Sequence, residues 1–408
     1  MSFVDFLLKI IAYGQKQFIA GKWVTRAAQI TGGFRPVKSD IVPHVSGQDK
    51  MALGIESAKK RPPPILFSCA YQAVDTNMRM LLTIDERVHF VSHNPDLRKE
   101  LRLKIAVTAW MSGTKGLASE LAKQGKIAEQ MGFHSFWLPE NHFGDHRSLP
   151  APLMLLSAVA ATTSSIRLGS TSYLLPIRNP ILAAEEVAVL DRLSGGRVIL
   201  GVGRGVQPAM FDVFDIPVKE KRLRFKKNLD IMIDAWRGKP IIPAEGNQES
   251  ICLAPLPVQT PHPPIWVAAF GPLALKQAGT LGLPYLASPV ETLTTLTENY
   301  QTHREHAKNA GVTDISATPV MRTLFVSNNK TQVKEVKAAL EGGMGHAMRP
   351  ESATVDDWTI IGEPSYVREK ILEYENKTGM THLIVRGQIP GISNEAQLVN
   401  FEQLLALF

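Results

Sequence analysis

The sequence predicts an α/β protein, a (β/α)8 barrel of the TIM type preceded by an N-terminal extension of unknown fold. From about residue 101 onward, eight apolar segments of strand length alternate with segments of helical periodicity. The apolar segments show little polar alternation, which is typical of parallel strands covered by helices. Eight such units in about 300 residues suit a closed barrel.

The main alternative is an open, doubly wound sheet. Such a sheet has a G-x-G-x-x-G turn after its first strand, where it binds a dinucleotide. Residues 110–117, WMSGTKGL, stand at that place and lack the pattern. We therefore expect a barrel domain over residues 101–408 and assign no fold to residues 1–100.

The predicted strands and helices follow one another along the barrel domain. Strands are expected at 101–110, 133–140, 166–175, 197–205, 264–271, 283–290, 320–327 and 381–387. Helices are expected at 119–132, 151–163, 179–196, 224–238, 272–281, 291–310, 331–341 and 364–378. Helix 179–196 has Pro180 in its first turn and two glycines at its end, the usual positions of these residue types.

The bulk composition is that of a globular protein with a sizeable core. Hydrophobic residues make up 44% of the 408 residues and charged residues 20%. No apolar run reaches the roughly 18 residues that predict a membrane span. The two cysteines, Cys69 and Cys252, are too few for a disulfide framework and have no second ligand at a zinc-type spacing. We therefore expect a cytoplasmic protein without a metal.

The basic charge lies mainly in the N-terminal extension. Residues 1–100 hold 14 Lys+Arg against 9 Asp+Glu, a balance of +5, and the rest of the chain holds 31 against 29, a balance of +2. The basic residues are scattered, so we interpret them as solvated surface and expect no nucleic-acid partner. Residues 3–21 suit a packed or dimer-contacting helix, with a membrane-surface helix as the alternative, and residues 31–64 look loop-rich.

Polar residues follow the second predicted strand, in WLPENHFGDH at 137–146. In a barrel, ligands bind at the carboxyl ends of the strands, so this segment faces the barrel mouth. His142 is then a candidate acid, base or hydrogen-bond donor. The alternative is that Asn141 and His142 only satisfy backbone groups of the loop.

Three more strand ends describe a site for a flat ring with a phosphate. STSYLLPIRNP, at 170–180, offers small hydroxyl residues that a planar ring can approach closely. GVGRGV, at 201–206, flanks Arg204 with glycines, and arginine is a natural partner of phosphate. AAFGPLALKQAG, at 268–279, begins a helix after Gly271, and the free N–H groups of a helix N-terminus favour an anion.

These segments resemble the bacterial luciferase-like, flavin-dependent monooxygenase family. The resemblance runs from about Leu103 to about Gly387 and rests on WLPENHF, GSTSYLLP, LSGGRVILGVGRG and PIWVAAFG in family order. It implies a TIM barrel that takes reduced FMN from a separate flavin reductase. It also implies a peroxyflavin, formed with O2, that oxidises a small organic substrate such as an aldehyde. A homodimer is the family's usual assembly.

The resemblance also assigns individual residues. Thr171 and Ser172 would lie against the isoalloxazine, where the family often has a non-proline cis peptide, and Arg204 would meet the phosphate. The stretch Ala269, Phe270 and Gly271, with the helix after it, would complete the phosphate cradle. Asn141 and His142 would be the catalytic pair.

Two positions depart from the luciferases proper. Luciferases have two adjacent histidines in the second-strand motif, and Asn141 replaces the first, which has the catalytic role there. Asparagine cannot take up a proton at neutral pH, which argues against light-emitting chemistry but not against monooxygenation, since oxygenase relatives also carry asparagine here. The fifth-strand turn lacks the hydroxyl and acidic side chains of luciferases, so backbone N–H groups would bind the phosphate with Arg204.

Three other functions remain open from the sequence. They are a dehydrogenase of the same superfamily that uses the deazaflavin F420, a barrel that binds flavin without turnover, and a metal-dependent barrel hydrolase. The hydrolase is disfavoured because His142, Asp145 and His146 share one loop. The substrate is not legible, and we expect the loops 205–220, 240–264 and 342–360 to form its pocket walls.

Overall fold

The computed structural model describes residues 103–111, 117–143, 148–341 and 350–408. The chain divides into two compact units, Met1–Leu101 and Arg102–Phe408. The expectations for residues 1–100 lie outside the described residues, and so do Asp145 and His146. The described residues all belong to the second unit.

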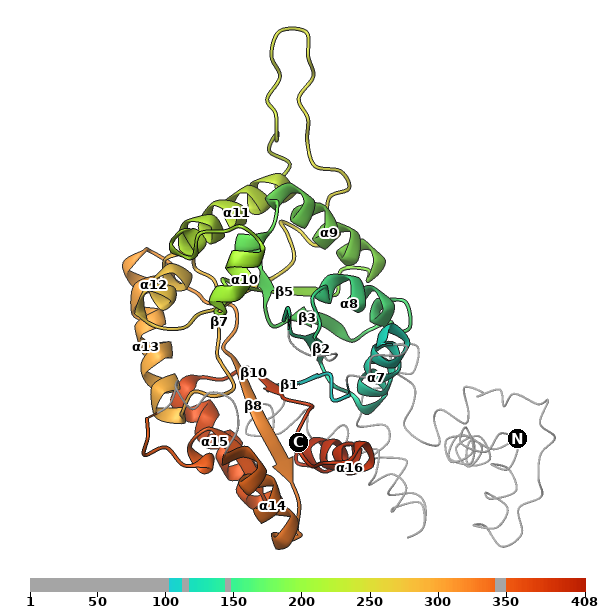
Figure 1. The fold of residues 1–408 in the computed structure, drawn as a ribbon, viewed down its shortest axis with the longest axis vertical. Coiled ribbons are helices and arrows are strands. Elements are labelled where there is room, and N and C mark those ends of the chain that lie inside the picture. The colour runs from blue at the N-terminus through green and yellow to red at the C-terminus, as the bar shows by residue number, and fades with distance from the viewer. Residues whose placement is uncertain (1–102, 112–116, 144–147, 342–349) are drawn as a thin grey trace, which may run out of the picture. The chain divides into compact units, whose positions relative to one another are not determined.

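Within the described residues, eight parallel strands form the predicted barrel (Figure 1). They are β1 (Lys104–Thr108), β2 (Ser135–Leu138), β3 (Arg167–Ser170), β5 (Val198–Gly203), β6 (Ile265–Ala268), β7 (Tyr285–Leu286), β8 (Pro319–Val326) and β10 (His382–Val385). They pair in the order β7-β6-β5-β3-β2-β1-β10-β8. The backbone N–H of Ala287 donates to the carbonyl of Pro319 at 3.4 Å, which links β7 to β8 and closes the barrel. The (β/α)8 prediction is confirmed.

Helices surround the strands in Figure 1. They are α7 (Leu117–Met131), α8 (Pro152–Ala160), α9 (Pro180–Leu193), α11 (Lys221–Trp236), α12 (Pro272–Thr280), α13 (Leu293–Asn309), α15 (Pro364–Thr378) and α16 (Asn394–Leu405). Local chemistry sets several of their ends. The Asn179 side chain caps α9 by accepting from the N–H groups of Ile181 and Leu182. Gly379 ends α15 in the left-handed conformation, with φ 72°.

Several elements were not predicted. β9 (Thr359–Gly362) pairs with the second half of β8 after the first half has paired with β10, whereas β4 (Tyr173–Leu174), which pairs with β5, lies within the strand expected at 166–175. The helix α10 (Pro208–Val213), the short turn η5 (Val355–Asp357) and α16 were also not expected, whereas α14 (Lys330–Glu341) was. The missed strand, β9, is only four residues long, too short for a period to show.

The core has an inner and an outer layer. Inside the barrel, Trp137 and Trp266 stack with ring centroids 5.0 Å apart among small and aliphatic residues. Gly169 makes room for this stack, because a Cβ at that position would clash with the Trp137 ring. The larger outer layer joins alternate strand residues, such as Val107 and Phe136, to the helices.

The segment 240–264 does not form a pocket wall, and the prediction that it does is wrong. It connects the end of α11 to the start of β6, so it lies at the amino ends of the strands, opposite the barrel mouth. Figure 1 shows it as a long excursion beyond α11 and α9. Isolated bridges join its two arms, Ile242 to Ile251 and Glu245 to Gln248. Its proline-rich composition marks a connection but does not show that the connection runs from helix to strand.

Candidate active site

A cavity of about 440 Å³ opens at the carboxyl ends of four neighbouring strands, β2, β3, β5 and β6. A volume of this size accommodates a cofactor or drug-sized ligand. The cavity is lined by Glu140, Asn141, His142, Thr171, Ser172, Leu174, Gly203, Arg204, Gly205, Val206, Gln207, Met210, Lys221, Ala268, Phe270, Leu273 and Ala274. The structure therefore brings together in one place most of the residues that the sequence singled out.

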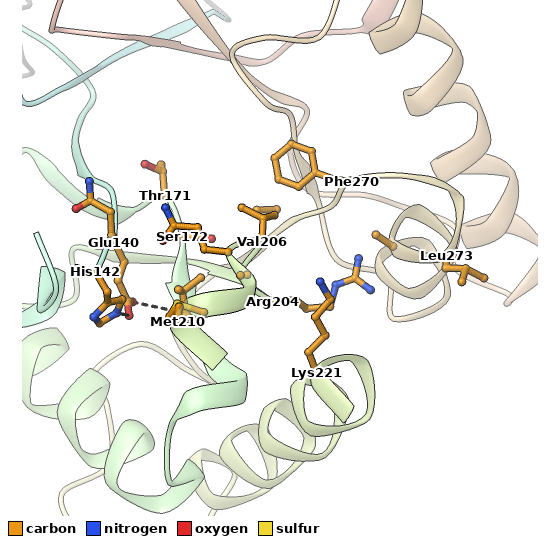
Figure 2. Close-up of a pocket in the computed structure, with 17 residues that line it drawn as sticks. Glu140, His142, Thr171, Ser172, Arg204, Val206, Met210, Lys221, Phe270 and Leu273 are labelled. Atoms are coloured by element: carbon orange, nitrogen blue, oxygen red, sulfur yellow. Dashed lines mark hydrogen bonds and ion pairs between the residues drawn. The ribbon is translucent and has the colours of Figure 1, made fainter. Parts of the chain in front are cut away.

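Positive charge gathers at one end of the cavity. Arg204 follows β5, and Lys221 begins α11; Figure 2 shows the two side chains together on the same side. Burial and the nearby charge of Arg222 lower the pKa of Arg204. Among the described residues, no carboxylate pairs with Arg204. This end of the cavity is therefore positively charged and suits an anionic ligand.

The turn between β6 and α12 lies beside this positive end. Gly271 is the N-cap of α12 and has φ 77°, a conformation that favours glycine. Phe270 is 40% exposed and lines the cavity, whereas Gly271, the next residue, is not one of the lining residues. Ala269 is placed differently from the sequence expectation: it is 1% exposed, packs in the outer core, and its neighbour Ala268 lines the cavity.

The end of β3 forms the wall next to β5. Thr171 and Ser172 both line the cavity, and the peptide bond between them is cis, as the family resemblance implied. Ser172 approaches the end of β5 so closely that a Cβ at Gly203 would clash with the Ser172 hydroxyl oxygen. One glycine of the GVGRG motif is therefore required for the contact between these two strand ends.

Glu140 is the buried charge of the site, and it was not among the residues expected from the sequence. Its side chain has no exposed surface. One carboxylate oxygen, Oε1, lies 2.8 Å from Nε2 of His142 and 2.8 Å from Nη1 of Arg178. The other, Oε2, accepts from the backbone N–H of Leu174 at 3.0 Å. The carboxylate thus ties the end of β2 to the segment after β3, and its full set of partners offsets the cost of burial.

His142 is held from two sides. Glu140 accepts a hydrogen bond from Nε2, which places the proton of the neutral ring there and leaves Nδ1 as the acceptor. Phe214 meets the imidazole edge to face, with ring centroids 5.2 Å apart, and Phe143 lies 5.6 Å away. His142 is only 8% exposed and lines the cavity, so its orientation is determined before any ligand binds.

Asn141 has a partner in the loop. Its side-chain oxygen accepts from the backbone N–H of Leu149, and its own backbone N–H donates to the Leu149 carbonyl at 3.3 Å. This is the loop-satisfying arrangement that the sequence left open as the alternative for the ENH motif. Asn141 still lines the cavity, but one of the two polar atoms of its side chain is already occupied.

The family motif LSGGR has a structural explanation. The buried guanidinium of Arg197 donates to the carbonyls of Ser194, Ile166, Ala160 and Thr163 and to the Thr163 hydroxyl, at 2.6–3.0 Å. These bonds join the end of α8, the end of α9 and the start of β5. The motif therefore identifies the fold rather than a catalytic group.

Two residues of the site were missed because their roles depend on distant partners. A glutamate in a loop motif gives no sign of its burial, although its place in ENH, two residues before His142, was an available signal. Lys221 stands in a charged helix start, KEKRLRFKK, where lysine usually lies on a solvated face. Among the described residues, no group of three or more His, Cys, Asp or Glu could hold a metal ion, and no helix is long and apolar enough to cross a membrane.

The sequence is similar to an uncharacterized protein and to two enzymes, one named as flavin-dependent and one as F420-dependent. Uncharacterized protein y4wF of Sinorhizobium fredii is 27% identical over 67% of this chain and 87% of its own length. The oxygenase component of the flavin-dependent trigonelline monooxygenase of Acinetobacter baylyi is 30% identical over 39% of this chain and 45% of its own. The F420-dependent glucose-6-phosphate dehydrogenase of Amycolatopsis mediterranei is 24% identical over 70% and 92%.

Solved structures share the fold. The monooxygenase RslO1 from Streptomyces bottropensis superposes with a TM-score of 0.64 at 21% identity, over 74% of this chain and 98% of that one. The oxygenating constituent of 3,6-diketocamphane monooxygenase from Pseudomonas putida, in complex with FMN, gives 0.61 at 21% identity, over 74% and 96%. The model of the family described as luciferase-like monooxygenase matches residues 103–382, and the chain belongs to this family.

Proposed function

We propose that this protein is a flavin-dependent monooxygenase that uses reduced FMN and O2 to oxidise a small organic substrate. The observation that carries the proposal is Arg204. It is a partly buried cation without a described carboxylate partner, at one end of a cavity in the barrel mouth, beside Lys221 and the N-terminus of α12. A phosphate on a flat, ring-bearing cofactor satisfies that arrangement.

The residues present fit FMN along the length of the cavity. Arg204 and Lys221 would bind the phosphate, and the free N–H groups that follow Gly271 would add donors to the same anion. Glycines and small hydroxyl residues at the ends of β3 and β5 keep the neighbouring wall flat. Bound reduced FMN supplies the two electrons with which O2 is activated.

The other residues of the cavity orient the reactants and hold a proton. Glu140 keeps the proton of neutral His142 on Nε2, so that Nδ1 is available to accept one from a reactant. Phe270 and Leu273, 40% and 62% exposed, give the rim an apolar surface that excludes water once a substrate is bound. The organic substrate itself is not specified by these contacts.

Binding of reduced FMN to the wild type and to Arg204→Met tests the proposal. Anaerobic titration should show about tenfold to hundredfold weaker binding to the variant, because charge-assisted hydrogen bonds contribute about 1.5–3 kcal/mol. Arg237→Met, at an exposed position after α11, is the matched control and should bind as the wild type does. Once O2 is admitted, bound flavin should reoxidise more slowly than free flavin. Reoxidation at the free rate, or no binding, would contradict the proposal.

An F420-dependent dehydrogenase is the second candidate, and the similarity to an F420-dependent enzyme over 92% of its length favours it. F420 also carries a phosphate, so Arg204 alone does not separate the two cofactors. The same titration with reduced F420 decides between them. Tighter binding of F420, with fast reoxidation of any bound FMN, supports the dehydrogenase.

We propose that a separate reductase supplies the reduced flavin. The relative from Acinetobacter is an oxygenase component, which supports supply of reduced flavin by another protein.

We also propose that the protein forms a homodimer. The helices α8 and α9 present exposed apolar residues: Met154, Leu182, Val189 and Leu193. Light scattering should give the mass of a dimer, and Leu182→Glu with Leu193→Glu should give the mass of a monomer. A monomeric wild type would remove the dimer from the proposal.

A further inference from the structure

Arg386 stands at the barrel mouth, directly after β10. Side chains alternate along this strand: Leu383 and Val385 belong to the outer core, and Ile384 belongs to the inner core with Trp137 and Trp266. The next inward position after Ile384 is Arg386. Its Nη1 reaches the Thr323 hydroxyl of β8, which is also two residues beyond an inner-core residue, Met321. Arg386 therefore belongs to the uppermost inward layer of the barrel.

The strand order places Arg386 across the mouth from Arg204. Arg204 follows β5, and three strands separate β5 from β10 in either direction around the closed barrel. The cavity at the ends of β2, β3, β5 and β6 thus has a cation at its phosphate end, and the opposite side of the mouth has a second one. A ligand extending from Arg204 toward the barrel axis approaches Arg386.

The surroundings of Arg386 differ from those of the structural arginines. Arg322 is fully buried, and its guanidinium donates to the carbonyls of Ser288, Met321 and Glu291 and to the Tyr374 hydroxyl, at 2.7–2.9 Å. Within the part of the chain that the structure describes, the Arg386 side chain makes one long hydrogen bond, of 3.5 Å to Thr323. Among the described residues, no carboxylate pairs with it, and burial alone lowers its pKa. Arg386 is thus a half-buried cation whose other donors have no protein partner among the described residues, which suits an anionic acceptor.

We infer that Arg386 binds a planar anionic group in the barrel mouth, with its guanidinium fork donating two parallel hydrogen bonds. Two sources offer this chemistry: a carboxylate of the organic substrate, and the pyrimidine edge of reduced flavin, which is anionic when the oxidised form is neutral. The second source rests on the proposed function. The first does not, because a carboxylate can be tested without flavin.

The test compares Arg386→Met, Arg386→Lys and Thr323→Val with the wild type by equilibrium binding. The probes are reduced FMN, oxidised FMN and a series of simple carboxylates (acetate, hexanoate, benzoate and nicotinate), titrated by calorimetry. The methionine variant should bind reduced FMN, or the best carboxylate, about tenfold more weakly or worse, and the lysine variant should lie between it and the wild type. Oxidised FMN should change less than about twofold.

Thr323→Val is the control for a structural role, because it removes the hydrogen bond that Arg386 makes within the described part of the chain and leaves the guanidinium in place. It should bind every probe as the wild type does. If Arg386→Met loses affinity only for reduced FMN, the anionic group belongs to flavin. If it loses affinity only for carboxylates, the anionic group belongs to the organic substrate. Three outcomes overturn the inference. Arg386→Met binds the probes as tightly as the wild type does, Thr323→Val loses as much affinity as Arg386→Met, or the wild type binds neither class of probe. If the wild type binds carboxylates through Arg386 but binds no FMN, the proposed function is wrong while the inference that Arg386 binds an anionic group is supported.

Discussion

Glu140 and His142 are joined by a hydrogen bond of 2.8 Å between Oε1 and Nε2, within a loop that begins directly after β2. The same oxygen meets the Arg178 guanidinium at 2.8 Å. Arg178 in turn lies over the Tyr173 ring, 3.7 Å from its centroid, and Tyr173 donates to Glu186 at 2.7 Å. The orientation of the candidate catalytic histidine therefore depends on a charged network that begins at a fully buried carboxylate.

Breaking this network should destabilise the fold. Glu140→Gln keeps the size of the side chain but leaves Arg178 with a neutral partner, so we expect a loss of about 3 kcal/mol in the free energy of unfolding. Urea denaturation measures it. Arg224→Met, which breaks the exposed pair with Glu220, is the control and should cost less than about 1 kcal/mol. Additive losses in Glu140→Gln combined with Arg178→Met would show that the two residues do not interact energetically.

His142 should matter for turnover and not for flavin binding. His142→Gln keeps a polar side chain but removes the imidazole that would accept a proton from a reactant, so the rate of substrate oxidation should fall about 100-fold or more. The dissociation constant for reduced FMN should stay within about threefold, because the proposed phosphate ligands, Arg204 and Lys221, lie at the other end of the cavity. A large loss of FMN affinity with an unchanged rate would reassign His142 to binding.

Substitution of Asn141 should lower the stability of the fold more than the rate of turnover, the reverse of what a catalytic residue shows. Asn141→Ala removes the acceptor of the Leu149 N–H, so we expect about 1 kcal/mol less stability, measured by urea denaturation. Asn141→Asp keeps an acceptor oxygen and should recover most of that loss. If both variants abolish turnover at wild-type stability, Asn141 takes part in the chemistry and its bond to the loop is secondary.

The contact between Gly203 and Ser172 can be tested by a paired substitution. Gly203→Ala places a methyl group where the Ser172 hydroxyl lies, so the ends of β3 and β5 must separate. We expect weaker binding of FMN, by about tenfold, and a lower melting temperature. Adding Ser172→Gly removes the clashing atoms and should restore most of both properties. Failure of this rescue would show that alanine at 203 acts through something other than Ser172.

Acid should destabilise the protein through two histidines at the amino ends of the strands. Burial lowers the pKa of His382 to about 3 and that of His134 to about 4; nearby Lys104 and Arg167 oppose charge on both rings, and His134 also opposes charge on His382. Both pKa values lie below the ordinary 6.5. Between pH 6.5 and pH 4 these two histidines therefore bind protons in the unfolded chain but stay largely neutral in the folded protein. Stability therefore falls as the pH is lowered through this window.

Urea denaturation at pH 7 and pH 5 measures the effect. The wild type should lose about 2 kcal/mol for each of the two histidines. His382→Phe keeps a ring against Trp266, whose ring centroid lies 4.9 Å from that of His382, and should reduce the loss by about 2 kcal/mol. His306→Ala, on α13, is the control and should leave the dependence unchanged. An equal pH dependence in the wild type and His382→Phe would contradict the assignment.

Much of this fold could be predicted because its information is local. Strand and helix periodicity, capping residues such as Asn179 and terminal glycines such as Gly379 act within a few neighbours along the chain. The eight barrel strands lie within or overlap the predicted segments, and the strand ends pointed to the cavity. The 240–264 excursion was misplaced because composition does not tell which end of a barrel a connection crosses.

The candidate site also has residues that the sequence revealed and residues that only the structure revealed. Thr171, Ser172, Arg204 and His142 were recognisable because each stands in a motif at a strand end, where a parallel sheet collects its ligand-binding groups. The sequence by itself thus determined the barrel, the face of the site and the presence of a cation, Arg204, at one end of it. Only the tertiary structure decided that Glu140 is buried between His142 and Arg178, that Lys221 joins Arg204, and that Arg386 lies across the mouth. These relations join residues far apart in sequence, and they arise only when the sheet closes into a barrel and brings its strand ends together.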